Sequence, residues 1–85
     1  MIIKQHKRFQ KAYNKLTKAR RAKVDAALSL FASDPENASL HLHELRPTGC
    51  GIFSINVGGD LRCHFVLIEG GVEFIALGTH AKLYG

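Results

Sequence analysis

The sequence predicts an α+β fold in which two antiparallel helices pack on a mainly antiparallel sheet. Two observations lead to this prediction. Apolar residues recur at helical spacing before residue 34, whereas after residue 51 they fall into short runs typical of strands. Glycine pairs separate these runs, as expected for hairpin turns. A chain of 85 residues has room for one hydrophobic core, so residues 1–85 are predicted to form a single domain.

The first half of the chain is predicted to contain one strand and two helices. The opening MIIK is short, apolar and β-branched, which favours a strand. Little turn signal separates the two helices, which indicates an antiparallel pair with a tight connection. The second helix should end at Asp34, because a residue that precedes proline disfavours helical geometry. The apolar faces of the helices are Phe9, Tyr13 and Leu16, and then Val24, Ala27, Leu28 and Phe31.

The second half is predicted to form a meander of three antiparallel strands. Residues 38–51 have the composition of an extended segment and a loop, and the strand-like runs IFSINV, LRCHFVLIE and VEFIALG follow. In the first hairpin, a three-residue loop with a bulge would pair Val57 with Leu61 and Ile55 with Cys63. The opposite face of the sheet would then carry a polar stripe of Ser54, Asn56, Arg62 and His64.

The positive charge of the chain is concentrated at its N-terminal end. The net charge is +5, and nine lysines and arginines precede the first acidic residue, Asp25. The remaining three bases are outnumbered by seven acids. A cationic surface of this kind favours a polyanion or an acidic protein as a partner. A solvated helix face would explain the same charges equally well, so the charges alone do not decide between the two interpretations.

Cofactors, disulfides and membrane segments are not expected. Cys50 and Cys63 have no accompanying metal-ligand spacing and are too few for a disulfide scaffold. Both are therefore predicted to be free thiols, with Cys63 in the core. No apolar run approaches the roughly 18 residues of a membrane span, and the first ten residues lack the apolar stretch of a signal peptide. We expect a cytoplasmic protein without a metal or another cofactor.

Five histidines in this short chain indicate a capacity for acid/base chemistry, because imidazole titrates near neutral pH. Each of them also has an ordinary explanation as a surface or hydrogen-bonding residue. No Ser-His-Asp order, phosphate-binding glycine loop or metal motif is present. RNA cleavage suits a surface of histidines and arginines. It requires a base for the 2′-hydroxyl, an acid for the leaving 5′-oxygen and donors for the charge on phosphorus, and it needs no metal.

Several short motifs occur in an order that resembles a known family. These are the lysine-rich KRFQKAYNKL, then DPEN, HEL, SINVGGDLRCHF and the closing LGTHAKLY. Together they resemble the RelE/ParE superfamily of toxins from bacterial type II toxin–antitoxin systems, and in particular the YafQ-like mRNA interferases. The resemblance implies a RelE-like β-α-α-β-β-β fold and cleavage of translated mRNA in the ribosomal A site. It also implies a cognate antitoxin that neutralises the toxin through an acidic segment.

The resemblance also assigns site residues by position. The catalytic set it implies is His43, Asp60, Arg62, His80 and Tyr84. A second set is predicted to bind RNA or the ribosome, mainly from the N-terminal charge and the polar stripe. It is Lys7, Lys11, Lys15, Lys18, Arg46, Asn56, His64 and Lys82. Asn56 stands where YafQ-like proteins have a further histidine. Because asparagine cannot carry a proton, either activity is lower or His64 or His41 substitutes.

The chain end is expected to be ordered, because the resemblance places it in the site. A central strand ending at Gly78 and Thr79 would deliver His80 near Asp60. Leu83 would hold the tail against the core, so that Tyr84 stands beside the imidazole. A second interpretation is a ParE-like protein that poisons DNA gyrase by binding, or an inactive binding module. The histidine set favours the nuclease, since a gyrase binder does not require it.

Overall fold

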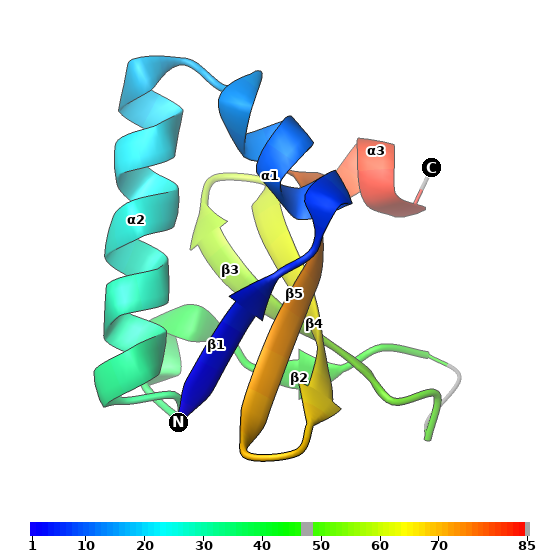
Figure 1. Cartoon of the computed structure of the whole chain (residues 1–85). Coiled ribbons are helices and arrows are strands. Elements are labelled where there is room, and N and C mark those ends of the chain that lie inside the picture. Colours follow the sequence, from blue (N-terminus) through cyan, green and yellow to red (C-terminus); the bar gives the residue numbers. More distant parts are fainter. Residues whose placement is uncertain (47–48, 85) are drawn as a thin grey trace.

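One five-stranded sheet and three α-helices make up the structure (Figure 1). The computed structural model describes residues 1–46 and 49–84, apart from the side chain of Tyr84. In chain order the elements are β1 (Ile2–Gln5), α1 (Lys7–Asn14), α2 (Lys18–Ser33), the 3-10 turn η1 (Ala38–Leu40), β2 (His43–Glu44), β3 (Ile52–Gly58), β4 (Leu61–Ile68), β5 (Gly71–Thr79) and α3 (His80–Tyr84).

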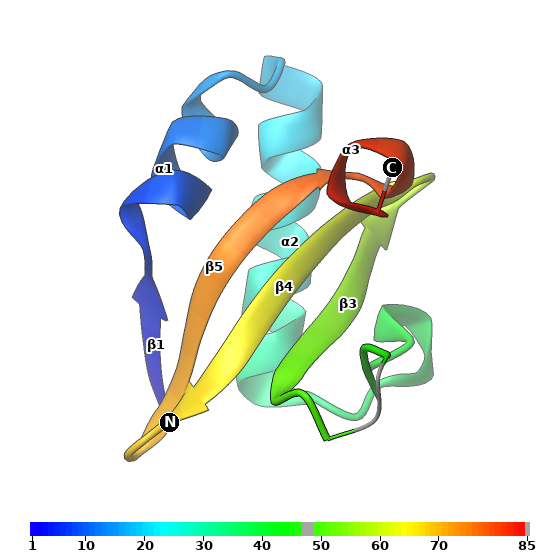
Figure 2. The ribbon, with the colours of Figure 1, turned by 90° about the vertical axis from the view of Figure 1, so that its right-hand side faces the viewer.

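The sheet has the strand order β1-β5-β4-β3-β2. β1 runs parallel to β5, and the other neighbours pair antiparallel. Figure 2 shows α2 behind the sheet and α3 in front of the end where β5 finishes. The helices α1 and α2 therefore cover one face and leave the other to α3 and the segment around β2. This arrangement confirms the predicted α+β fold of two helices on a mainly antiparallel sheet.

Both long helices begin at a side-chain cap. His6 caps α1, where its Nδ1 accepts a hydrogen bond from the backbone N–H of Arg8 at 3.1 Å. Thr17 caps α2 in the same way for Arg20, at 3.2 Å. Threonine is a favoured N-cap residue. Thr17 therefore marks the junction between the helices in the sequence, which the spacing of apolar residues did not reveal. The predicted end of α2 is confirmed, because Asp34 is its C-cap.

Polar contacts hold the two helices at their junction. The Tyr13 hydroxyl on α1 donates to the Asp25 carboxylate on α2 at 2.7 Å. This hydrogen bond is the main cause that raises the pKa of the Tyr13 phenol, followed by burial and the charge of Asp25. Nη1 of Arg21 donates to the carbonyl of Leu16 at 3.1 Å, which closes the turn between the helices. None of the helices among residues 1–46 and 49–84 is long and apolar enough to cross a membrane.

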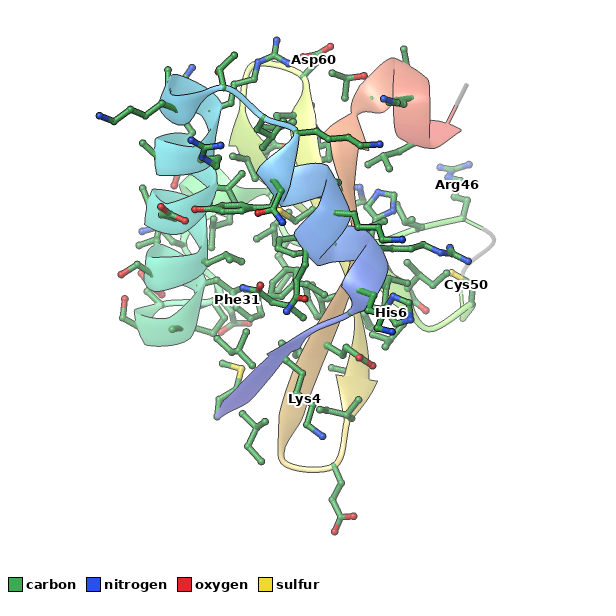
Figure 3. The ribbon with its side chains drawn as sticks, turned by 45° about the horizontal axis from the view of Figure 1, so that its top comes forward. Lys4, His6, Phe31, Arg46, Cys50 and Asp60 are labelled. Carbon is green, nitrogen blue, oxygen red and sulfur yellow. The ribbon has the colours of Figure 1, made fainter. Side chains whose placement is uncertain are left out.

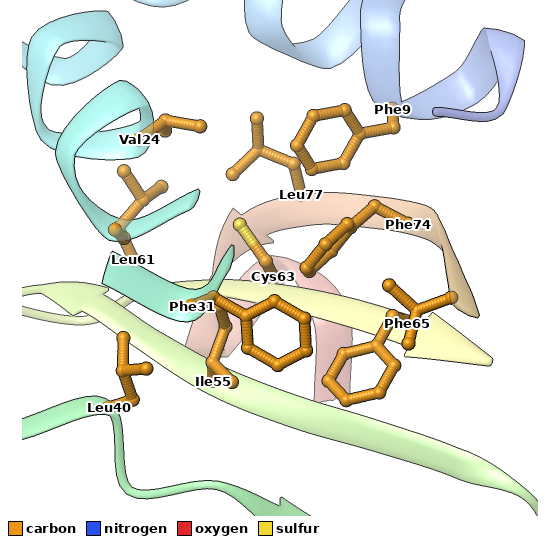
Figure 4. Close-up of a cluster of buried hydrophobic side chains, with 12 residues drawn as sticks. Phe9, Val24, Phe31, Leu40, Ile55, Leu61, Cys63, Phe65, Phe74 and Leu77 are labelled. Carbon is orange, nitrogen blue, oxygen red and sulfur yellow. The ribbon is translucent and has the colours of Figure 1, made fainter. Parts of the chain in front are cut away.

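The core is a single cluster between the helices and one face of the sheet (Figure 4). Phe9 of α1 packs on Phe74 with ring centres 5.6 Å apart, and Phe31 of α2 lies 5.0 Å from Phe65. Phe65 also lies 5.3 Å from Phe74, and Phe53 stacks on Phe65 at 5.4 Å, so the chain's five phenylalanines form one continuous group. Cys63 is a buried free thiol in this core, as predicted, and burial raises its pKa to about 12.

The first hairpin differs from the prediction by one position. Ile55 pairs with Cys63 as expected, but Gly58, rather than Val57, lies opposite Leu61. The predicted bulge is present. It falls before the turn, within residues 56–58, so the loop shortens to two residues, Gly59 and Asp60. Gly59 has φ +58°, a left-handed geometry that glycine adopts without strain and that suits a two-residue turn.

A second irregularity in β5 was not predicted. His64 pairs with Ala76 and Phe65 with Phe74, so Ile75 is an extra residue on β5. Without this bulge, the alternation of the strand would put Phe74 and Leu77 on opposite faces. With it, both are buried in the core. The bulge also sets which side chains of β5 face the site described below.

Candidate active site

Polar side chains from adjacent strands form two rows on the face of the sheet opposite α1 and α2. Residues directly opposite one another in antiparallel strands project to the same face. The first row is His43 on β2, Ser54 on β3 and His64 on β4. The second is Asn56 on β3 and Arg62 on β4, continued by Gly78 on β5. The predicted polar stripe is therefore present, and His43 extends it by one strand.

An open hollow of about 1010 Å³ lies over these rows. It brings together His43, Arg62 and His80 of the predicted catalytic set, and Arg46, Asn56 and His64 of the predicted binding set. The complete lining is His41, Leu42, His43, Glu44, Leu45, Arg46, Ile52, Asn56, Arg62, His64, His80 and Leu83. Positive and titratable groups therefore surround an opening that has apolar walls. This composition suits a phosphate with an attached sugar and base.

A hydrogen bond to the backbone fixes the orientation of the His43 ring. Its Nδ1 lies 2.7 Å from the carbonyl oxygen of His41. A carbonyl can only accept, so Nδ1 carries the proton and a neutral His43 has its lone pair on Nε2. His41 has φ +48° and is the one non-glycine among the described residues with a positive φ. This left-handed residue bends the backbone just before His43, and its carbonyl oxygen contacts the His43 ring.

The Arg62 guanidinium is held by the turn that precedes it. Its Nη1 donates to the carbonyl of Gly59 at 2.9 Å and to that of Leu61 at 3.1 Å. A guanidinium has five N–H donors in a rigid plane, and these two bonds use only Nη1. The hairpin therefore orients Arg62 while Nη2 and Nε retain N–H donors suited to a phosphate.

His64 and Ser54 are the two buried residues of the first row. His64 is 7% exposed and lines the hollow, and Ser54 is fully buried beside it. Burial lowers the pKa of His64 below its ordinary 6.5, and the charge of His43 lowers it further. Within the described part of the chain, the Ser54 hydroxyl is the one buried side-chain oxygen or nitrogen without a hydrogen-bond partner. The sequence predicted that Ser54 shares a face with His64, but it did not predict that Ser54 is fully buried.

The lowered pKa of His64 predicts that stability falls in mild acid. The unfolded chain binds a proton near pH 6.5, whereas the folded chain binds it only at lower pH. The contribution of this group to stability is therefore complete above pH 6.5 and is lost as the pH falls from 6.5 through the lower pKa of the folded chain. We expect a lower melting temperature at pH 5 than at pH 7.5, and a smaller difference in His64→Gln. His6→Asn, which alters an exposed histidine and keeps an N-cap, should retain the wild-type difference.

The chain end meets the hairpin as the sequence predicted. The backbone N–H of His80 donates to the carbonyl of Asp60 at 2.8 Å. Thr79 Oγ1 accepts from the N–H of Lys82 at 3.2 Å and so caps the start of α3. The methyl Cδ2 of Leu83 lies 3.5 Å from the position that a Cβ on Gly78 would occupy, so this side chain covers the strand end.

Two predicted catalytic residues are not placed in the hollow. Asp60 is exposed at the tip of the β3–β4 hairpin, beside α3, and its side chain is not part of the lining (Figure 3). The bond to His80 comes from its backbone. Tyr84 ends α3, and its side chain lies outside what the structure describes. Both assignments remain predictions.

A second hollow of about 430 Å³ lies between α1, the start of α2 and α3. Its cationic lining contains the predicted Lys11, Lys15 and Lys82, and also Arg8 and Arg20, which were not predicted. Arg8 could have been found, because Arg8, Lys11 and Lys15 follow the three- and four-residue spacing of one helix face. Its apolar lining is Ala12, Leu16, Leu61 and Leu77. The predicted Lys7 and Lys18 are exposed but do not line it.

No metal centre is formed by the described residues, among which no group of three or more histidine, cysteine, aspartate or glutamate side chains could hold an ion. Acid/base catalysis by imidazoles and charge stabilisation by Arg62 are chemistry that the hollow can perform with its own side chains.

Known structures share this architecture along the whole chain. YafQ from Escherichia coli strain BL21(DE3) is 25% identical, with a TM-score of 0.77 over 99% of this chain and 98% of that one. The chain has the RelE/ParE toxin fold in its YafQ-like form. A chain of the E. coli DinJ–YafQ toxin–antitoxin complex gives the same identity and TM-score, over 99% and 97% of the two chains. The resemblance drawn from the sequence is thus confirmed.

A more distant toxin has the same architecture. A chain of the archaeal RelE–RelB complex from Pyrococcus horikoshii OT3 is 19% identical, with a TM-score of 0.71 over 94% of each chain. No protein-family model and no curated protein sequence matches the chain. The similarity to YafQ found by comparison is therefore a similarity to solved structures.

Proposed function

We propose that this chain is the toxin of a toxin–antitoxin pair and that it cleaves translated mRNA as a ribosome-dependent endoribonuclease. The observation that carries the proposal is the hollow in which His43, His64 and His80 surround Arg62. The YafQ-like fold supports the toxin assignment, and the DinJ–YafQ and RelE–RelB complexes support an antitoxin as partner.

The reaction needs three groups that the hollow provides. A base removes the proton of the 2′-hydroxyl, and O2′ attacks the adjacent phosphorus. The bond from phosphorus to O5′ breaks as an acid donates a proton to O5′, which leaves a 2′,3′-cyclic phosphate and a 5′-hydroxyl. Negative charge builds on the phosphoryl oxygens meanwhile, and the Arg62 guanidinium stabilises it.

The register of the strands supports an in-line arrangement of these groups. Residues two apart on a strand are separated by about 7 Å. Along β5, Ala76 faces the His64 row, Gly78 faces the Arg62 row, and His80 follows beyond it. A phosphate bound at Arg62 would therefore have His80 on one side and the His43–His64 row on the other. In-line displacement requires the base and the acid on opposite sides of phosphorus.

The remaining predicted residues take supporting roles in this proposal. Asp60 accepts a hydrogen bond from the backbone N–H of His80 and so positions the start of α3, while its exposed carboxylate does not line the hollow. Asn56 donates a hydrogen bond to the phosphate from the Arg62 row. Tyr84 keeps the catalytic role that the resemblance implies, as a prediction from the sequence alone. Arg46, on the segment after β2, adds a positive charge at the edge of the hollow (Figure 3).

The second hollow, called the basic hollow from here on, is proposed to bind the ribosome or the antitoxin. Its cations can neutralise RNA phosphates, and Lys7 and Lys18 extend the same charge over α1 and α2. Its apolar lining would also accept a hydrophobic side chain from an acidic antitoxin segment. One partner would thus exclude the other from this surface, which would couple neutralisation to release from the ribosome.

Reversing one charge in the basic hollow should weaken binding to ribosomes. Lys15→Glu is expected to raise the dissociation constant for 70S ribosomes by about 10-fold or more and to reduce its dependence on salt. Lys4→Glu is the matched control, because Lys4 is exposed on β1 and does not line the hollow. Sedimentation at several salt concentrations measures both. Equal weakening in the two variants would show that only net charge matters.

The function is tested by inducing the chain in bacterial cells and mapping mRNA ends by primer extension. We expect growth arrest and cuts within a reporter mRNA that is translated, but none in the same mRNA without its start codon. Double-strand breaks in DNA with intact mRNA would instead support the gyrase-poisoning alternative and contradict the nuclease. Growth arrest with neither lesion would indicate a binding module.

A further inference from the structure

We propose that His64, a buried residue of the central strand β4, is the general base of the reaction, with Ser54 as the partner of its protonated ring. This assignment rests on the proposed nuclease function and names the residue that starts the chemistry. It departs from the sequence-based prediction, in which the resemblance implied His43 as a catalytic histidine and the polar stripe placed His64 among the RNA-binding residues.

Distance within the sheet favours His64 over His43. His64 and Arg62 are two residues apart on the same face of β4, so their Cα atoms are separated by about 7 Å. His43 lies on β2, two strands from β4 and one row from Arg62. With strands about 4.8 Å apart, its Cα is about 12 Å from that of Arg62. A 2′-hydroxyl next to a phosphate on Arg62 is therefore nearer to His64.

The surroundings of His64 suit a base. The side chain lines the hollow, yet only 7% of it is exposed, so the protein holds the ring in place. Burial and then the charge of His43 lower its pKa, so it is neutral and able to accept a proton at physiological pH. The titratable and charged side chains around the same hollow are His41, His43, Glu44, Arg46, Arg62 and His80.

Ser54 gives the protonated base an acceptor. A base that takes the 2′-hydroxyl proton becomes an imidazolium, which is costly to bury without a partner. Ser54 lies directly opposite His64, is 0% exposed, and has a hydroxyl oxygen without a partner among the described residues. Its lone pairs can accept a hydrogen bond from the ring N–H that does not face the substrate. This bond would strengthen as the ring becomes charged, so it would stabilise the transition state more than the ground state.

This arrangement explains how the site works with asparagine at position 56. The Asn56 amide cannot accept a proton in the reaction. His64 lies on the facing strand, diagonally across from Asn56, so it projects into the same part of the hollow. The base would therefore come from β4 instead of β3, while Asn56 keeps a role as a hydrogen-bond donor. His43 then acts as a positioning residue whose charge sets the protonation of His64.

The first test measures single-turnover cleavage of mRNA in programmed ribosomes. His64→Gln is expected to lower the rate at saturating toxin by about 100-fold or more, with little change in half-saturating toxin concentration. Ser54→Ala should lower the same rate by about 10-fold, the size expected for a lost hydrogen bond to a charged group. It should also leave the melting temperature unchanged or raise it, because it removes a buried hydroxyl without a partner. His6→Asn serves as the control that keeps the wild-type rate.

The second test uses pH and keeps His64 in place. In the wild type, the rate should fall in acid with an apparent pKa below the 6.5 of an ordinary histidine. His43→Gln removes a charge that lowers the His64 pKa. The acid limb of the pH–rate profile, where the rate falls with falling pH, should therefore move to higher pH in this variant. His43 is exposed, which makes misfolding of this variant a small concern.

Three results would overturn the assignment. A His64→Gln variant with a rate within about threefold of wild type would exclude His64 as the base, since a general base contributes about 100-fold or more. If His80→Gln then still abolished cleavage, the nuclease function would stand without this assignment. An acid limb that does not move in His43→Gln would exclude the coupling. Absence of cleavage by the wild type would remove both this inference and the proposed function.

Discussion

Replacing His80 with glutamine is expected to lower mRNA cleavage by about 100- to 10,000-fold, the usual contribution of a general acid or base. His80 begins α3 on the side of Arg62 opposite the His43–His64 row. In the proposed mechanism, with His64 as the base, His80 is the acid that protonates the leaving O5′. Glutamine can donate a hydrogen bond but cannot transfer a proton at neutral pH. The loss should therefore appear in the rate of cleavage rather than in binding to ribosomes.

The structure also makes this variant a fair test. The bond from His80 to Asp60 uses the backbone N–H, which glutamine retains, and the Thr79 cap of α3 is unchanged. Single-turnover cleavage and ribosome binding would be measured for His80→Gln and for the control His6→Asn, an exposed histidine outside the hollow. Cleavage by His80→Gln at a rate similar to that of the control would rule out His80 as an acid or base.

Replacing Gly71 with alanine is expected to cause the largest loss of stability, about 2–4 kcal/mol in the free energy of unfolding. A Cβ at this position would overlap the backbone of Ile2, at 2.6 Å from its carbonyl carbon and 2.7 Å from its nitrogen. Backbone cannot move aside as a flexible side chain does. β1 would have to separate from β5, although its parallel pairing with residues 71–74 covers one edge of the sheet.

Gly78→Ala is the matched control for this prediction, because it makes the same substitution on the same strand. There the new methyl group would lie 3.5 Å from Leu83, which is an ordinary contact. Thermal melting should show a decrease of about 10 °C or more for Gly71→Ala, and only a small change for Gly78→Ala. Similar melting temperatures for the two variants would mean that β1 adapts to the added atom.

Much of this fold could be predicted because local signals agree with the tertiary structure. The residue before Pro35 ends α2, and the alternation in residues 52–67 sets the polar face opposite the core. The bulges were harder to predict. The bulge before Gly59 and the one at Ile75 depend on how strands pair and pack, and a single residue in either changes which side chains meet.

The site could be predicted only as a set of residue types. Spacing placed Ser54, Asn56, Arg62 and His64 on one face, and the resemblance added His43 and His80. Burial was not accessible in this way, because the low exposure of His64 arises from the elements around it. Arg20 lines the basic hollow because of the angle between α1 and α2, and no local sequence pattern specifies that angle.

The chemical ends of the cleaved mRNA distinguish attack by O2′ from attack by water. The proposed mechanism predicts a 2′,3′-cyclic phosphate, or the 3′-phosphate formed when it hydrolyses, on the upstream fragment and a 5′-hydroxyl on the downstream fragment, because O2′ is the nucleophile. Fragments made on programmed ribosomes by the purified protein would be examined by enzymatic end-labelling and mass spectrometry. A 5′-phosphate on the downstream fragment would show that water attacked phosphorus directly, and would contradict the proposed acid/base mechanism around Arg62.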